Sequence, residues 1–166
     1  MSLTTYCDFA EVRSTLGVND SELKDTVLGL PVYEMGLVRE LNKVSTSLNA
    51  AFSALYAKTP GTRTQEESNL HDTVRLFSVY AVAKQVGVSL ANFAPKDISD
   101  GKASVARFAG TPFEAVLDRI DSMYSSLKEE LKAAYEAFTG ASSKASTTPT
   151  LAFRKSQSSY DPVKGA

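Results

Sequence analysis

The chain has 166 residues, 43% hydrophobic and 22% charged, which is enough for one soluble domain with a core of its own. Its formal net charge is −1, but residues 1–140 carry 14 basic against 18 acidic side chains, and residues 141–166 carry four basic against one acidic. A body with this acidic excess lacks the clustered cationic surface that general nucleic-acid binding requires.

Two short helices are expected at the start of the chain. Residues 6–16 fit a helix with Thr5 as its N-cap. Asn19 fits the cap of a second helix over about 20–28, and Glu22 stands three residues later, where it completes a capping box. Asp8 and Glu11 also do not fit a secretory signal, so we expect a soluble intracellular protein.

Two longer helices follow in the sequence. Apolar residues recur at steps of three and four over residues 31–58, which predicts one continuous amphipathic helix. Thr64 and Glu67 form a further capping box that opens a helix over 64–86, with Gly87 as its expected end. This helix is apolar over a wide arc, so we expect it to be the most buried member of the fold.

The last helix is the longest. Residues 88–110 lack a clean period, although 103–109 fit a helical turn or two. Residues 111–140 then predict one amphipathic helix, capped by Thr111 and ended by Gly140. Its apolar stripe, at steps of three and four, consists of Phe113, Val116, Leu117, Ile120, Met123, Tyr124, Leu127, Leu131, Tyr135 and Phe138.

These elements predict an all-α fold, a helical bundle of three long helices plus short N-terminal helices, because no strand alternation of useful length is present. We assign residues 1–140 to this bundle and residues 141–166 to a flexible linker followed by an extended C-terminal arm. The linker part is rich in serine and threonine, whereas the arm brings back large apolar and basic side chains. The candidate docking residues of the arm are Leu151, Phe153, Arg154, Lys155, Tyr160 and Val163. The alternative is a disordered end with scattered apolar residues.

The search for catalytic or metal-binding chemistry is mostly negative. His71 is the single histidine, so one chain cannot form a two-histidine metal site, and a packing role is the simpler interpretation. Cys7 has no CxxC partner, and burial as a small apolar side chain is expected. The carboxylates of the last helix lie mostly opposite its apolar stripe, which favours a solvated face over a catalytic pair. We therefore expect that the protein is not an enzyme and that it uses no cofactor.

One glycine-containing segment briefly resembles a calcium loop. With Gly101 at the sixth position of such a loop, Lys96, Ile98 and Arg107 would occupy ligand positions, and none of them can bind calcium as required. Lys102 is followed by alanine, not by the serine or threonine of a P-loop. A third hypothesis, an enzyme that uses Asp100 and Lys102, would require strongly perturbed pKa values in a pocket.

Two blocks resemble a known family. The opening YCDFAEVRSTLGVNDSEL (6–23) and the block ISDGKASVARF (98–108), followed by a long helix and an arm, resemble head–tail adaptor proteins of tailed bacteriophages, also called connector or head-completion proteins. The likeness covers nearly the whole chain in order and length. The family-like residues of the second block are Asp100, Gly101, Lys102, Arg107 and Phe108.

The resemblance implies a structural virion protein at the head–tail junction, assembled in the bacterial host cytoplasm. Such adaptors form a ring, usually of twelve copies, beneath the portal protein, and they present a platform to neck or tail-completion proteins. The C-terminal arm would dock on the portal, and genomic DNA would pass through the channel without sequence-specific binding. No membrane partner is implied. The alternative function is a small soluble helical binding or regulatory module with a disordered tail.

Overall fold

The computed structural model describes residues 2–93, 97–99, 104–106 and 114–145, and within them the fold is an all-α bundle, as predicted. A 3-10 turn at Leu3–Thr5 precedes the first helix, and a second one at Pro60–Thr62 precedes α5. The helices are α1 (Phe9–Leu16), α2 (Asp25–Leu28), α3 (Pro31–Val44), α4 (Leu48–Ala57), α5 (Gln65–Phe93) and α6 (Glu114–Ala145).

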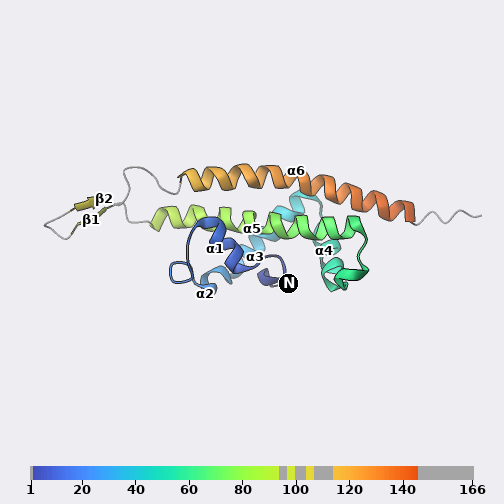
Figure 1. Ribbon diagram of the computed structural model, residues 1–166, viewed down its shortest axis with the longest axis horizontal. Coiled ribbons are helices and arrows are strands. Elements are labelled where there is room, and N and C mark those ends of the chain that lie inside the picture. The colour runs from blue at the N-terminus through green and yellow to red at the C-terminus, as the bar shows by residue number, and fades with distance from the viewer. Residues whose placement is uncertain (1, 94–96, 100–103, 107–113, 146–166) are drawn as a thin grey trace, which may run out of the picture.

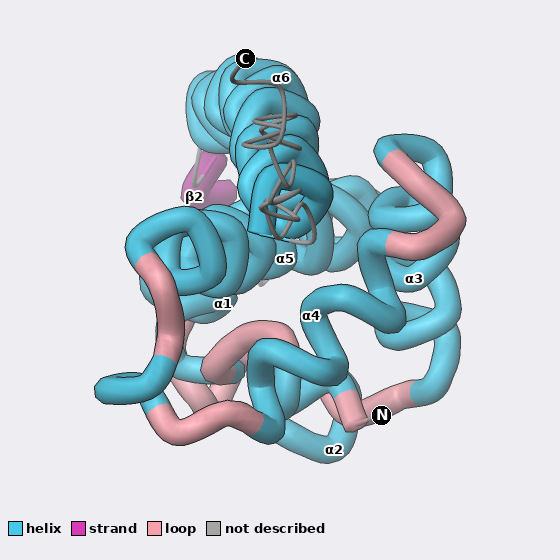
Figure 2. The backbone as a smooth tube through the Cα atoms, turned by 90° about the vertical axis from the view of Figure 1, so that its right-hand side faces the viewer, coloured by secondary structure: helices cyan, strands magenta, loops and turns pink. Residues whose placement is uncertain are grey.

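The two longest helices, α5 and α6, lie side by side along the long axis of the molecule (Figure 1). Helix α5 also contacts α1, α3 and α4, so it occupies the centre of the bundle, as its wide apolar arc predicts. Viewed along this axis, α1 and α3 lie on opposite sides of α5, and α6 covers α5 from a third direction (Figure 2).

The apolar stripe predicted for α6 faces α5 and supplies part of the core. Ile120, Leu127 and Leu131 are almost fully buried, whereas Met123 is 37% exposed and lies at the margin of the stripe. These positions recur at the helical period, so α6 presents one face to α5 and leaves the opposite face in solvent.

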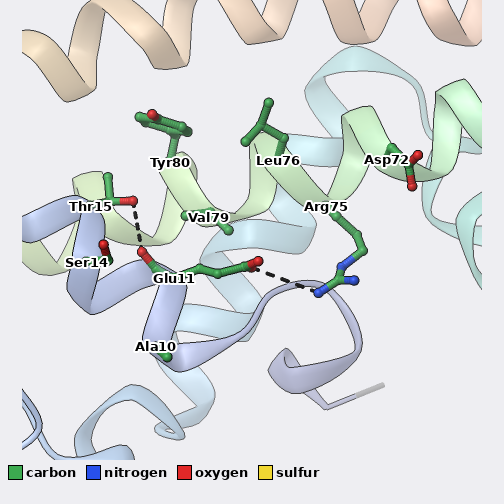
Figure 3. Close-up of a pocket in the computed structure, with 9 residues that line it drawn as sticks. All are labelled: Ala10, Glu11, Ser14, Thr15, Asp72, Arg75, Leu76, Val79 and Tyr80. Atoms are coloured by element: carbon green, nitrogen blue, oxygen red, sulfur yellow. Dashed lines mark hydrogen bonds and ion pairs between the residues drawn. The ribbon is translucent and has the colours of Figure 1, made fainter.

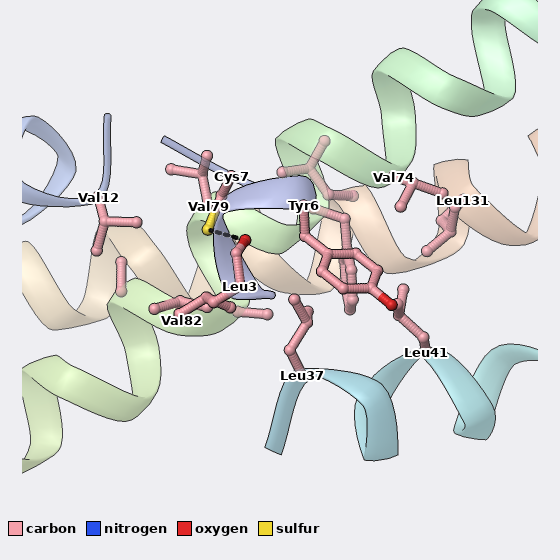
Figure 4. Packing of buried hydrophobic residues seen from close by; sticks show 14 of the residues in the cluster. Leu3, Tyr6, Cys7, Val12, Leu37, Leu41, Val74, Val79, Val82 and Leu131 are labelled. Atoms are coloured by element: carbon pink, nitrogen blue, oxygen red, sulfur yellow. Dashed lines mark hydrogen bonds between the residues drawn. The ribbon is translucent and has the colours of Figure 1, made fainter. Parts of the chain in front are cut away.

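The N-terminal residues complete the core on the other side of α5. Tyr6 and Cys7 are buried beside residues of α3 and α5 (Figure 4). Tyr6 stacks on Phe52 at 5.2 Å between ring centroids and donates a hydrogen bond to Asn49. His71 is buried and also stacks on Phe52, with 5.5 Å between the ring centroids. The packing roles expected for Cys7 and His71 are therefore confirmed.

The continuous helix expected over 31–58 is wrong, because the chain breaks between α3 and α4. Ser45 adopts an extended conformation with φ −158° and ψ 138°. Its hydroxyl accepts a hydrogen bond from the backbone N–H of Ser47 at 3.3 Å. Serine side chains compete in this way with helical backbone hydrogen bonds, so residues 45–47 divide the helix.

The helix ends predicted at Gly87 and Gly140 are also wrong, since α5 and α6 continue through these residues. At Gly87 the reason lies in packing. A Cβ atom built there would lie 2.6 Å from Leu117 Cδ2 and 3.3 Å from Leu16 Cδ2. The missing side chain of Gly87 thus lets α1 and α6 approach α5 closely.

The N-terminal capping differs in part from the prediction. Asp8, not Thr5, caps α1, and it forms a capping box with Glu11. Asn19 and Glu22 make the expected reciprocal hydrogen bonds, but they close a single turn, and α2 begins only at Asp25.

The capping box predicted for the central helix is confirmed. Thr64 N donates to Glu67 Oε2 at 3.0 Å, and Glu67 N donates to Thr64 Oγ1 at 3.2 Å.

A short antiparallel hairpin lies between α5 and α6. Strands β1 (Asp97–Ser99) and β2 (Ser104–Ala106) pair with Ile98 opposite Val105. The helical turn expected over 103–109 is therefore wrong for the three residues of β2. The predicted cap of the last helix, Thr111, lies outside the described residues.

Candidate functional site

The residues predicted to carry function lie outside the described part of the chain. This holds for the arm residues Leu151, Phe153, Arg154, Lys155, Tyr160 and Val163. It also holds for the family-like residues Asp100, Gly101, Lys102, Arg107 and Phe108, although the strands on both sides of 100–103 pair with each other. Helix α6 extends to Ala145, so the segment that follows the helix begins at 146 and not at 141.

The described residues contain no group of three or more histidine, cysteine, aspartate or glutamate side chains that could hold a metal ion. In the same part of the chain, none of the helices combines the length and the apolarity that crossing a bilayer requires. The Cys7 thiol is buried, and this burial, together with the nearby charge of Glu11, raises its pKa to about 12. Such a thiol stays protonated at neutral pH and is a poor nucleophile.

One open groove lies between α3, α5 and α6 and has a volume of about 720 Å³. Its charged and phenolic lining residues are Arg39, Glu40, Lys43, Lys84, Tyr124 and Lys128. Four of these side chains are cationic and one is anionic, so the groove is positive in a body that is acidic as a whole. We call it the cationic groove.

A small network fixes the floor of the cationic groove. Tyr124 Oη donates to Glu40 Oε2 at 2.6 Å, and Lys43 Nζ donates to Glu40 Oε1 at 2.5 Å. Lys84 lies over the Tyr124 ring, 4.6 Å from its centroid, and pairs with Asp121 at 2.9 Å. These contacts join α3, α5 and α6, so the cations of the groove are held on three different helices.

The same contacts shift two pKa values. Burial raises the pKa of Glu40, but the hydrogen bonds from Lys43 and Tyr124 favour the carboxylate and bring the pKa below its ordinary value. Burial and the neighbouring Glu40 carboxylate raise the pKa of Tyr124. Glu40 is therefore ionised at neutral pH, and the Tyr124 phenol remains a hydrogen-bond donor.

The second groove lies between α1 and α5 and has a volume of about 620 Å³ (Figure 3). Its lining combines apolar residues of α5 with Glu11, Asp72 and Arg75, and a long ion pair of 3.9 Å joins Glu11 to Arg75. A neighbouring depression shares Arg75 with this groove and is lined by Asp8, Asp25 and Arg13. We call the two together the acidic flank, since they hold four exposed carboxylates, Asp8, Glu11, Asp25 and Asp72, against Arg13 and Arg75.

The two grooves lie on opposite sides of the same helix. The residues of α5 that line the acidic flank include Asp72 and Leu76, and those that line the cationic groove include Ala81 and Gln85. Asp72 and Ala81 are nine residues apart, as are Leu76 and Gln85. Nine residues correspond to about two and a half helical turns, which places the two sets half a turn apart. Figure 2 shows the same arrangement, with α1 and α3 on either side of α5.

Exposed apolar side chains accompany both grooves. Leu76 lines the groove of the acidic flank and is 47% exposed, while Val88 lines the cationic groove and is 58% exposed. Met35, which is 70% exposed, forms a shallow depression with Arg39 next to the cationic groove. Each side of the molecule therefore offers apolar surface bordered by charge, the composition of many protein interfaces.

The sequence interpretation did not predict these grooves. Their residues come from helices whose contacts depend on tertiary packing, and the charges of α3 resemble an ordinary solvated helix face when seen alone. The available signal was the wide apolar arc of α5, because a helix that is covered on several sides leaves grooves between its neighbours.

Comparisons with protein families, with curated proteins and with solved structures find no significant match to this chain. The function therefore has to be argued from the residues and from the arrangement described above.

Proposed function

We propose that the chain is a structural adaptor of a tailed-bacteriophage particle, which assembles as a ring between the portal protein and the neck or tail. Its C-terminal arm would dock on the portal, and the ring would extend the channel through which genomic DNA passes. A ring of twelve copies is the number that the family resemblance implies. In this proposal the protein acts at the head–tail junction after assembly in the bacterial cytoplasm.

The observation that carries this proposal is the continuity between α6 and the arm. Helix α6 runs to Ala145 and extends beyond the rest of the bundle at its C-terminal end (Figure 1). The 21 residues that follow have first a linker composition and then large apolar and basic side chains. A segment with such anchors, attached to a projecting helix, suits docking on a neighbouring protein and not packing on its own bundle.

A ring would multiply this contact. When several arms belong to one assembly, binding of the first arm raises the effective concentration of the others at their sites. A modest affinity for each arm is then sufficient for stable attachment. The exposed face of α6 carries Asp118, Asp121, Glu129 and Glu136, and an acidic surface of this kind suits a channel wall that DNA passes without binding.

The test is capture of virion components from infected host cells with the full-length protein and with a version that ends at Ala145. This end point leaves α6 whole, whereas an end at Gly140 would remove the last residues of the helix. A matched full-length variant replaces the apolar anchors Leu151, Phe153 and Tyr160 by alanine, which preserves the length and charge of the arm. Captured proteins are identified by mass spectrometry and imaged by electron microscopy.

We expect the full-length protein to recover a portal ring, and both altered versions to lose it. Recovery of the ring by all three versions would refute the role of the arm and assign the contact to the bundle. Failure of the full-length protein to recover any virion component would refute the adaptor proposal.

One observation favours the second candidate, a small helical binding module. Val27, Leu30, Val32 and Met35 lie within nine residues at the α2–α3 corner and are all exposed, Met35 by 70%. Apolar surface of this kind marks a contact site for another protein. A protein that remains monomeric or dimeric, with no virion partner in the capture experiment, would support this module.

A further inference from the structure

The cationic groove and the acidic flank form two complementary sides of one molecule. We infer that copies of this chain associate head to tail, with the cationic groove of one copy receiving the acidic flank of the next. This inference assigns the contact between neighbouring subunits of the proposed ring. It rests on the proposed function only in one respect, that the associated copies close into a ring.

Charge complementarity identifies the occupant as a second copy. The lining of the groove carries Arg39, Lys43, Lys84 and Lys128 against Glu40, although the body has a net acidic charge. The acidic flank carries four exposed carboxylates, Asp8, Glu11, Asp25 and Asp72, against the two basic side chains Arg13 and Arg75. Opposite potentials of this kind guide association and set its register.

The apolar side chains supply the rest of the contact. Leu76 on the acidic flank and Val88 in the cationic groove are both about half exposed, and Met35 lies beside the groove. In a head-to-tail contact these residues would be covered while the charges remain at the rim. An apolar centre with a polar rim is the usual composition of a specific interface.

The placement of the two surfaces excludes the simplest symmetric dimer through either of them. A two-fold contact brings the same surface of both copies together, so groove would meet groove and carboxylates would meet carboxylates. Like charges across an interface are unfavourable. Because the two surfaces lie on opposite sides of α5, each copy can instead contact two neighbours at once, and repetition of this contact gives a ring or a filament.

Two charge-reversal variants test the inference. The groove variant carries Arg39→Glu and Lys128→Glu, and neither side chain makes a hydrogen bond or ion pair within the described residues. The flank variant carries Glu11→Lys and Asp72→Lys, two exposed acids that line the groove of the acidic flank. Glu11 contacts Arg75 at 3.9 Å and accepts a hydrogen bond from Asp8 N at 3.4 Å, and Asp72 is hydrogen-bonded to the adjacent His71. Circular dichroism and thermal unfolding establish that both variants fold.

A matched control variant carries Asp118→Lys and Glu136→Lys, the same change in charge as the flank variant. Both residues are exposed on α6, on the face turned away from its buried stripe. The control separates an effect of net charge from an effect of the acidic flank. Self-association is measured by sedimentation velocity and mass photometry over a range of protein concentrations.

We expect each test variant alone to associate about tenfold or more weakly than the natural chain, since exposed charge pairs are individually weak but each variant reverses two charges at once. The control should associate like the natural chain. An equal mixture of the two variants should recover association, because each variant retains one natural surface and the two altered surfaces are again complementary. Association of the natural chain should also weaken with salt, since the screening length falls from about 10 Å at 0.1 M to about 3 Å at 1 M.

Three results would overturn the inference: a monomeric natural chain at all concentrations, a closed dimer, or test variants that associate as well as the control. Each is distinguishable from failure of the adaptor proposal. A natural chain that captures the portal while its charge-reversal variants still associate refutes this interface alone. Complementary association without any captured virion component refutes the adaptor and leaves the interface in place.

Discussion

Replacing Tyr124 by phenylalanine removes the hydroxyl that joins α6 to α3. In the folded protein this hydroxyl donates to Glu40 Oε2 at 2.6 Å. A hydrogen bond to a charged group contributes about 1.5–3 kcal/mol to stability. The Glu40 side chain is 20% exposed and keeps its contact with Lys43, so we expect Tyr124→Phe to lower the free energy of unfolding by about 1.5 kcal/mol, the lower end of that range.

The effect should depend on pH in a defined direction. The folded-state pKa of Glu40 lies below its ordinary value, because the hydrogen bonds from Lys43 and Tyr124 together outweigh the opposing effect of burial. A carboxyl group with a lowered pKa stabilises the fold above its unfolded-state pKa of about 4.3, and this contribution is lost as the pH falls through the folded-state pKa. The difference between the natural chain and Tyr124→Phe should therefore be full at neutral pH and smaller in acid.

Urea unfolding at neutral and acidic pH measures this difference. A double-mutant cycle with Glu40→Gln isolates the coupling between the two side chains. The matched control is Tyr135→Phe on the same helix, whose ring packs against Phe138 and whose hydroxyl makes no hydrogen bond within the described residues. Equal losses for the two tyrosine variants, or a loss that does not change with pH, would refute the assignment of this bond.

Three further predictions concern the core and the helix ends. Gly87→Leu should lower the free energy of unfolding by about 1–3 kcal/mol, because its side chain would overlap with Leu117. Gly140→Ala should instead raise the helical content seen by circular dichroism, because among the described residues only its own stretch of helix lies within 4 Å of an added Cβ. Asp8→Ala should cost about 1 kcal/mol in urea unfolding, and a similar loss for Thr5→Ala would contradict the assigned cap. The Cys7 thiol, with its pKa raised to about 12, should resist alkylation in the native protein and react after unfolding; labelling of the native protein at the rate of a free thiol would show that the residue is accessible.

The helical period alone was sufficient to predict the fold class and the buried faces. Ile120, Leu127 and Leu131 are buried at the positions that their spacing indicates, and the Thr64–Glu67 box forms as its sequence pattern requires. These features are local, because a period and a cap depend on residues within one helix.

The errors concern features that local sequence does not determine. Gly87 has the conformational freedom to end a helix, but close packing against Leu16 and Leu117 keeps it inside α5. Ser45 lies within a regular apolar period, but its side chain accepts a hydrogen bond that competes with the helical backbone, and α3 ends before it. The two grooves arise from the relative placement of several helices, which one sequence does not reveal. The arm residues remain a prediction.

The passage of α6 through Gly140 determines where the proposed linker starts. A chain that left the bundle at a glycine turn could start in many directions, whereas a continuous helix carries a fixed direction and rotation from the bundle to Ala145. Each residue inserted into the last turns of α6 would advance that end by about 1.5 Å and rotate it by about 100°. One inserted residue would thus rotate the start of the linker more than four inserted residues, which restore nearly the original rotation. In the proposed adaptor, the phase of the helix as well as its length would therefore set the point from which the arm is tethered.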